Sequence, residues 1–206
     1  MTTSQTELPV ATPGWGTRIL QFPLTRIILP FFLLGVTVFG TGMLIKHLVP
    51  DKTMRVGWPY LVMISVFFGV YYLYVRLIEK RPMVEFSRPG ALRELAGGIV
   101  WGCILMSTVM GVLALVGAYH VSGSNSWTSV LAPIAEMGFV ALMEEVLFRG
   151  ILYRVIEKSL GTWTAIALSS ILFAAAHLGN DGVSALGVLN VAMAGVLLAG
   201  AYISTR

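Results

Sequence analysis

Two adjacent carboxylates, an arginine and a histidine lie within apolar stretches of this sequence. Glu144, Glu145 and Arg149 interrupt one stretch, and Phe173 and His177 occur in the next. Ionisable side chains at membrane depth are costly, so those that are retained there usually take part in function. A carboxylate can remove a proton from water, and an imidazole can orient that water, bind a metal ion or stabilise an oxyanion. These residue types therefore indicate hydrolysis within a membrane.

The spacing of the two glutamates separates their roles. Adjacent residues point about 100° apart on an α-helix, so Glu144 and Glu145 need different partners. Arg149 follows Glu145 by four residues, with the acid on the N-terminal side, which is the favourable order for an ion pair on one helix face. We therefore predict a structural Glu145–Arg149 ion pair, which leaves Glu144 available for chemistry.

The chain between Glu144 and His177 predicts that these two side chains meet. A polar turn at residues 158–162 separates two apolar helices, and the midpoint of the pair falls on Leu160 and Gly161. In an antiparallel hairpin that rises about 1.5 Å per residue, both side chains lie roughly 24 Å from the turn. Phe173 precedes His177 by one helical turn, so its ring can wall the cavity that holds the imidazole. We predict that Glu144 and His177 form a catalytic pair.

Two further polar residues are open to a structural or a functional interpretation. Glu136 lies two turns before Glu144 and about 80° around the same helix, and we interpret it as a cavity-lining or structural acid. Asn190 can form a hydrogen bond between helices or line the site. Both are kept as site-lining candidates.

The composition places the chain in a bilayer. Of its residues 56% are hydrophobic and 12% are charged, and the mean hydropathy is +0.82, which exceeds the values of ordinary soluble domains. Roughly 20 apolar residues cross a hydrocarbon core of about 30 Å. The sequence thus predicts an all-α, polytopic membrane protein with about six transmembrane helices. The expected spans are 27–45, 56–75, 95–119, 128–156, 162–178 and 183–204.

The connections predict the orientation and the domain organisation. Lys and Arg occur in the N-terminal arm and in the second and fourth loops but not in the third and fifth connections, and cytoplasmic loops retain positive charge. The first loop, with Lys46, Lys52 and Arg55, weakens this contrast. We therefore place both termini in the cytoplasm. Residues 1–25 form a flexible polar arm, and residues 26–206 form one helical membrane domain. The pI of about 9.4 is explained by these loops and by contact with membrane lipid, because the basic stripe with interleaved aromatic residues that is typical of nucleic-acid binding does not occur.

These residues resemble the motifs of the CPBP group of intramembrane proteases, also called the Abi family, which includes the type II CAAX prenyl endopeptidases. Glu144, Glu145 and Arg149 match its EExxxR motif, and Phe173 and His177 match its FxxxH motif. The resemblance covers residues 94–206. It implies a membrane endopeptidase in which Glu144 activates water, His177 orients that water or binds a metal ion, and Glu145 and Arg149 support the pair.

The resemblance also implies a location and classes of substrate. We expect a multi-pass protein of a bacterial or archaeal plasma membrane that cleaves peptide bonds close to the membrane surface. Some members of the family release the last three residues of prenylated proteins. Bacterial relatives are linked to bacteriocin processing or self-immunity. The expected partners are therefore membrane lipid and a peptide or protein substrate, which is prenylated in some members.

A third motif of the family, a histidine followed four residues later by an asparagine, has no counterpart after His177. A catalytic zinc ion normally takes three protein ligands and a water. Glu144 and His177 supply two, unless Glu136 or Asn190 contributes. We expect the natural chain to continue beyond Arg206 with this motif. The alternatives are that activity has been lost or that a partner supplies the missing group. Zinc is a candidate cofactor, although a glutamate–histidine pair can also activate water without a metal.

Two other functions are compatible with the same residues. A non-enzymatic membrane binding or bacteriocin-immunity protein would keep the helical hairpin without proteolysis. A small transporter would use Glu136, Glu144 and His177 as a proton path, although the sequence lacks the inverted repeat that is common in transporters.

Overall fold

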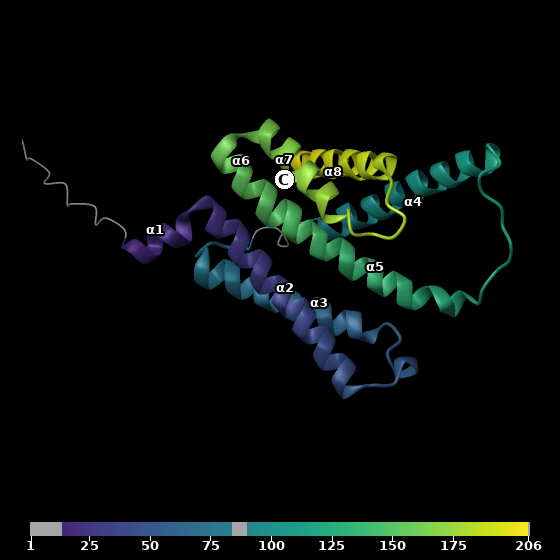
Figure 1. Ribbon diagram of the computed structural model, residues 1–206, viewed down its shortest axis with the longest axis horizontal. Coiled ribbons are helices and arrows are strands. Elements are labelled where there is room, and N and C mark those ends of the chain that lie inside the picture. Colours follow the sequence, from purple (N-terminus) through teal and green to yellow (C-terminus); the bar gives the residue numbers. More distant parts are fainter. Residues whose placement is uncertain (1–13, 84–89, 206) are drawn as a thin grey trace, which may run out of the picture. The chain divides into compact units, whose positions relative to one another are not determined.

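The computed structural model describes residues 14–83 and 90–205, and these residues contain helices but no strands (Figure 1). The α-helices are α1 (Trp15–Gln21), α2 (Pro23–Leu48), α3 (Trp58–Leu73), α4 (Ala91–Leu115), α5 (Leu131–Glu144), α6 (Arg154–Leu160), α7 (Thr162–Ala176) and α8 (Ala185–Thr205). Short 3₁₀ turns occur at Lys52–Met54 and Trp127–Val130, and π-helical segments at Tyr74–Ile78 and Glu145–Tyr153. The predicted all-α fold class is confirmed.

Four helices of the described residues are long and apolar enough to cross a bilayer: Pro23–Leu48, Trp58–Ile78, Ala91–Leu115 and Ala185–Thr205. They match four of the six expected spans. The expected span 128–156 is helical throughout, because the 3₁₀ turn Trp127–Val130, α5, the π-helical segment and α6 follow one another without a break to Leu160. The expected span 162–178 is the shorter apolar helix α7, Thr162–Ala176. An integral membrane protein is thus confirmed, whereas the number six is not.

The helix α4 shows how strongly the fold depends on an apolar environment. Its mean hydropathy is 2.1, yet none of its residues is buried inside the protein. A helix that is apolar all round and unburied in water would aggregate, whereas lipid solvates such a surface. The exposed side chains of α4 are therefore suited to contact acyl chains.

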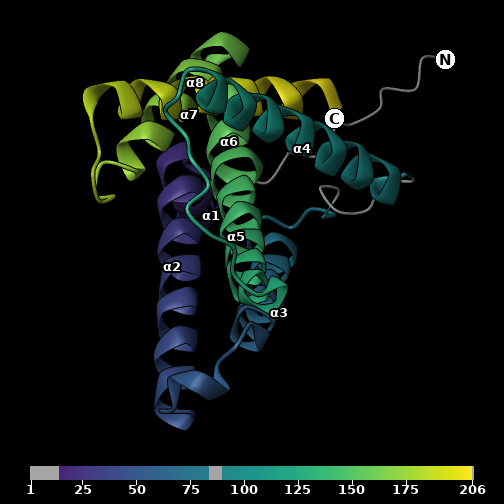
Figure 2. The ribbon, with the colours of Figure 1, turned by 90° about the vertical axis from the view of Figure 1, so that its right-hand side faces the viewer.

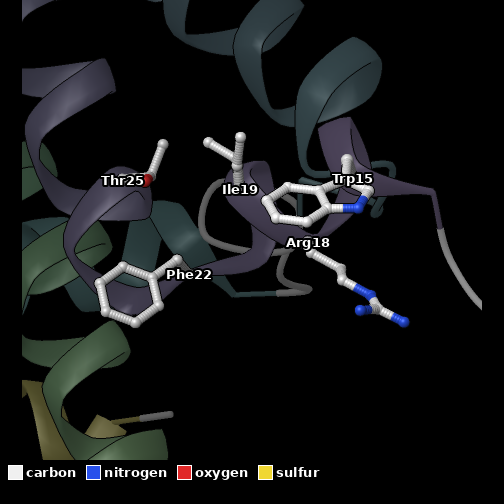
Figure 3. A pocket seen from close by; sticks show the side chains of 5 residues that line it. All are labelled: Trp15, Arg18, Ile19, Phe22 and Thr25. Atoms are coloured by element: carbon white, nitrogen blue, oxygen red, sulfur yellow. The ribbon is translucent and has the colours of Figure 1, made fainter.

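The N-terminal arm contains one short helix in its described part. Residues 1–13 lie outside the described residues, and α1 follows at Trp15–Gln21. Phe22 is extended, with ψ 133°, and Pro23 begins α2, where its missing N–H removes no helical hydrogen bond. A cavity of about 260 Å³ is formed where α1 meets α2 (Figure 3). Its lining consists of Trp15, Arg18, Ile19, Phe22 and Thr25.

The chain forms two compact units. The first combines Met1–Val36 with Glu144–Arg206, and the second is Thr37–Met143. In the second unit, Phe139 of α5 packs edge-on against Phe67 of α3, with their ring centroids 6.3 Å apart. Phe67 and Phe139 are both buried, so this aromatic contact holds α5 against α3.

The first unit has a continuous apolar core. The neighbouring helices α7 and α8 run antiparallel, and α6 and the π-helical segment Glu145–Tyr153 pack against α7 (Figures 1 and 2). The N-terminal part of α2 adds Ile27 and Phe31 to this core. The buried members of the core are Phe148, Leu152, Tyr153, Ile156, Ala165, Phe173 and Ala199.

The helices α7 and α8 lie close together at Gly195. A Cβ atom at this position would lie 3.0 Å from Cα of Ser170 and 3.1 Å from its Cβ. Since the first neighbour is backbone, a side-chain rotation cannot relieve the contact. Small residues commonly permit such close helix packing in membranes.

We expect Gly195→Ala to lower the free energy of unfolding by about 1–3 kcal/mol, because the added methyl group forces α7 and α8 apart. Gly200→Ala is the matched control on α8, since a Cβ atom added at Gly200 would have no neighbour within 4 Å. This control should be neutral or slightly stabilising, because alanine is the better helix former. Denaturation in mixed micelles would measure both changes, and equal stabilities of the two variants would contradict the prediction.

Candidate functional site

The first unit places Glu144 and His177 at corresponding ends of a helical hairpin. Glu144 is the last residue of α5, and His177 caps the C-terminus of α7. Gly161 forms the turn between α6 and α7 with φ +84°, a conformation that side-chain-bearing residues rarely adopt. The chain therefore reverses at the position expected from the midpoint of the pair.

The two predicted catalytic side chains are in contact. The Nε2 atom of His177 lies 3.5 Å from Oε1 of Glu144, and the side chains are 24% and 25% exposed, respectively. The contact that the equal-depth estimate predicted is thus confirmed. Partial exposure leaves room for a water molecule or a substrate to reach both groups.

The other ring nitrogen of His177 fixes its hydrogen-bonding role. Nδ1 lies 2.8 Å from the carbonyl oxygen of Phe173. A carbonyl oxygen can only accept, so Nδ1 carries the proton and donates it. In the neutral imidazole, Nε2 is then an acceptor that faces Glu144. A direct hydrogen bond between Nε2 and the Glu144 carboxylate requires a proton on one of the two groups. A water molecule that donates one proton to each group satisfies both acceptors without this additional proton.

Glu145 and Arg149 form the predicted ion pair. Nη1 of Arg149 lies 3.2 Å from Oε1 of Glu145. The Arg149 side chain is 4% exposed and that of Glu145 is 45% exposed, so the guanidinium is the group that depends on protein partners. A buried guanidinium without a counter-charge is strongly destabilising. The adjacent glutamates therefore have different partners, as their spacing predicted.

Phe173 connects this ion pair to the histidine. The Arg149 guanidinium lies over its ring, 4.9 Å from the centroid, and the ring centroids of Phe173 and His177 are 4.6 Å apart. Phe148 packs edge-on against the same ring at 5.0 Å. Nη2 of Arg149 also donates to the Gly195 carbonyl at 3.5 Å. One buried ring thus fixes the positions of both the arginine and the imidazole.

The EExxxR residues lie at the start of a π-helical segment. It extends over Glu145–Tyr153, and seven of its nine residues are buried. π-Helices are rare and occur frequently at functional sites. Nε of Arg154 donates to the Gly150 carbonyl at 2.8 Å, which gives that carbonyl an additional partner at the end of the segment. The π-helical segment is thus buried in the core, and its Arg149 side chain contacts the ring of Phe173.

The two site-lining candidates have different surroundings. Glu136 lies in the second unit, where the Tyr60 hydroxyl donates a hydrogen bond to it. Asn190 is exposed on α8, and none of the contacts described for residues 14–83 and 90–205 joins it to Glu144 or His177. Lining of the site by these two residues stays a prediction.

Several contributors to the site were not found from the sequence. Gly195 supplies a carbonyl to Arg149, and Phe148 packs on Phe173. Both contacts join distant segments, which a helical repeat does not reveal. The one signal in the sequence is Gly195 itself, because a small residue in a membrane helix permits a neighbouring helix to pack closely against it.

The side chains described do not complete a zinc site. Glu144 and His177 offer two donors, and no group of three His, Cys, Asp or Glu side chains gathers in residues 14–83 and 90–205. Catalytic zinc normally takes three protein ligands. The described residues do bring together a carboxylate and an imidazole, those of Glu144 and His177.

Phe173→Leu should separate positioning from stability. Loss of the ring removes the contacts to Arg149 and His177, and misplacement of catalytic groups lowers kcat by about 10- to 100-fold. We expect a loss of about 1–2 kcal/mol in unfolding free energy. Phe139→Leu is the matched control, because Phe139 is similarly buried, at 4% against 5% for Phe173, but lies in the second unit. It should lose comparable stability and keep kcat, and equal kcat losses would contradict a positioning role.

Residues 125–206 match the model of the family described as type II CAAX prenyl endopeptidase Rce1-like. All five motif residues fall inside this segment, so the family resemblance drawn from the motifs is confirmed there. No curated protein and no solved structure matches the chain.

Proposed function

We propose that this protein is an intramembrane endopeptidase of the CAAX-protease-like type, in which Glu144 is the general base and His177 orients the attacking water. The contact between Glu144 and His177 carries the proposal, because it brings an acid and an imidazole together from two segments of the chain. The family match to residues 125–206 supports the same reaction class.

The reaction begins with a water molecule between the two side chains. Neutral His177 accepts one hydrogen bond from it at Nε2, since Nδ1 already donates to Phe173. The Glu144 carboxylate accepts the other water proton as the oxygen attacks the carbonyl carbon of the peptide bond. The resulting tetrahedral intermediate collapses as protonated Glu144 delivers that proton to the leaving nitrogen. Water is consumed, the C–N bond is broken, and Glu144 is again a carboxylate.

The supporting residues determine the precision of this geometry. Arg149 contacts the ring of Phe173 on one side, and His177 stacks on the same ring. A fixed ring restricts the imidazole to an orientation in which Nε2 faces Glu144. Preorganised groups of this kind lower the barrier because little reorganisation accompanies the reaction. Glu145 then acts by holding Arg149 rather than by contacting substrate.

The setting restricts the class of substrate. The site belongs to an integral membrane protein, so its substrate is a membrane-inserted or lipid-modified peptide that reaches the pair through the bilayer or its surface. A prenylated C-terminal peptide is one such substrate and would require access from the cytoplasm, whereas the pair lies roughly 24 Å from the turn at residues 158–162 that the basic residues assign to the cytoplasmic side.

The test uses the purified protein in liposomes with two probes: a prenylated peptide and a single-span transmembrane peptide. Mass spectrometry of the products should show cleavage of at least one probe. His177→Ala should lower the rate by at least about 10²-fold, the scale of acid–base catalysis. His47→Ala is the matched control, because His47 is an exposed histidine near the end of α2. Cleavage by His177→Ala at the wild-type rate would exclude the proposed mechanism.

A further inference from the structure

A second cavity, separate from the Glu144–His177 pair, lies in the second unit where α2 ends and α3 begins. Its volume is about 310 Å³, which is at the lower end of the range for ligand sites. Three of its lining side chains are cationic: Lys46, Lys52 and Arg55. Positive charges that share one cavity repel each other, so an anion inside it would be stabilised by all three.

Arg55 has unused hydrogen-bonding capacity. Its Nη2 donates to the Pro50 carbonyl at 3.4 Å. Its Nε is buried and has no hydrogen-bond partner among the described atoms. A buried N–H without an acceptor is costly, so the guanidinium keeps a donor that the described protein atoms do not satisfy. A guanidinium also matches the geometry of a phosphate group.

Nearby carboxylates leave the cavity positive. Glu136 accepts a hydrogen bond from Tyr60, a lining residue. Asp51 belongs to the same loop as Lys52 and Arg55 and has an interaction of its own. Even with both acids counted, the three cations exceed the two anions by one. The Tyr60 hydroxyl already donates its proton to Glu136, so it cannot also donate to an anion in the cavity. Recognition of an anion therefore depends on the three cations.

The cavity also lies at the depth of lipid headgroups. Both adjoining helices are long and apolar enough to span a bilayer, and the connection between their ends therefore lies at a membrane surface. Trp58 begins α3 and its indole donates to the Met54 carbonyl at 2.7 Å. Tryptophan is enriched at this boundary. Below the cations, the lining continues with the apolar side chains of Ile45 and Met63.

We propose that this cavity binds the phosphate group of an anionic phospholipid, with the cations on the phosphate and the apolar lining against the glycerol and the first part of the acyl chains. The combination of cations and apolar side chains favours a lipid over a soluble phosphate. The cavity of Figure 3 differs, since Arg18 is its one cation and extends away from Phe22.

The proposal is tested by native mass spectrometry of the detergent-solubilised full chain with phosphatidylglycerol or phosphatidylcholine. Each basic residue near a membrane surface contributes an attraction that corresponds to about a fivefold change in binding. The double variant Lys46→Gln/Arg55→Gln should therefore retain about 25-fold less phosphatidylglycerol, with the retention of phosphatidylcholine unchanged. Lys52→Gln, which alters an exposed side chain, should give a smaller loss and guards against misfolding of the double variant.

The matched control is Lys80→Gln/Arg93→Gln, which removes the same charge from two exposed residues outside the cavity. It should retain the anionic lipid as the wild type does. Equal retention by the cavity variants and wild type, or equal losses in cavity and control variants, would overturn the proposal. Displacement of the lipid by an equal concentration of inorganic phosphate would overturn it in favour of a soluble phosphate ligand.

Discussion

Glu144→Gln is expected to lower kcat for peptide hydrolysis by about 10²- to 10⁴-fold, the range that a general base contributes. Glutamine has nearly the shape of glutamate and can still accept a hydrogen bond from water, but its amide cannot take the water proton. The contact with His177 at 3.5 Å can also persist, because the amide N–H can donate to Nε2. The fold and membrane insertion should therefore be unaffected, and the loss should appear in kcat rather than in KM.

Glu94→Gln is the matched control for this loss. Glu94 is also a glutamate of a membrane helix, but it is exposed in the first turn of α4. We expect kcat to remain near the wild-type value. A comparison of initial rates in liposomes at saturating substrate measures both variants. If Glu144→Gln kept the wild-type kcat, Glu144 would not be the base, and a binding or immunity function would become the better explanation of the chain.

Arg149→Met is expected to lower the free energy of unfolding by about 2–4 kcal/mol. The substitution retains much of the buried volume but removes the guanidinium, whose desolvated contact with an aromatic ring is worth about 2 kcal/mol. It also removes the hydrogen bond to the Gly195 carbonyl, and a typical hydrogen bond contributes about 0.5–1.5 kcal/mol. Because Glu145 is 45% exposed, its carboxylate stays solvated, which keeps the total below the cost of breaking a fully buried pair.

Unfolding in mixed micelles measures this change, with Arg93→Met as the control. Arg93 is exposed on α4, and substitutions at such positions are usually within about 0.5 kcal/mol of neutral. Arg149→Lys should also destabilise, because an ammonium is a compact, strongly hydrated charge that does not stack on a ring as a planar guanidinium does. Wild-type stability of Arg149→Met would show that the ion pair and the ring contact contribute little.

The Glu144–His177 contact could be predicted because it depends on counting along two helices joined by a short turn. Any two residues equidistant from the turn of an antiparallel hairpin lie at the same depth, whatever surrounds them. The Glu145–Arg149 pair was equally accessible, since it depends on one turn of a single helix. In both cases local spacing contains all the information that is needed.

The features that could not be predicted depend on contacts between distant segments. The π-helical segment could not be predicted, because apolar and polar periodicity distinguishes helix from strand but not α-helical from π-helical hydrogen bonding over nine residues. The expected span 128–156 is continuous as a helix, but its change from α-helical to π-helical hydrogen bonding at Glu145 was not foreseen. The carbonyl of Gly195 could not be assigned to Arg149 either, because the chain between them has no fixed geometry before the core forms.

The contribution of Phe31 to the core of the first unit has a consequence for biosynthesis. Its ring packs edge-on against Phe148 at 6.1 Å, although Thr37–Met143 intervenes as the second unit. At about 5–20 residues per second, the ribosome needs on the order of ten seconds to produce that intervening chain. During this time α2 lies in the bilayer before Phe148, the partner of its Phe31 ring, has been synthesised. A chaperone that shields Phe31 during this interval would raise the yield of folded protein.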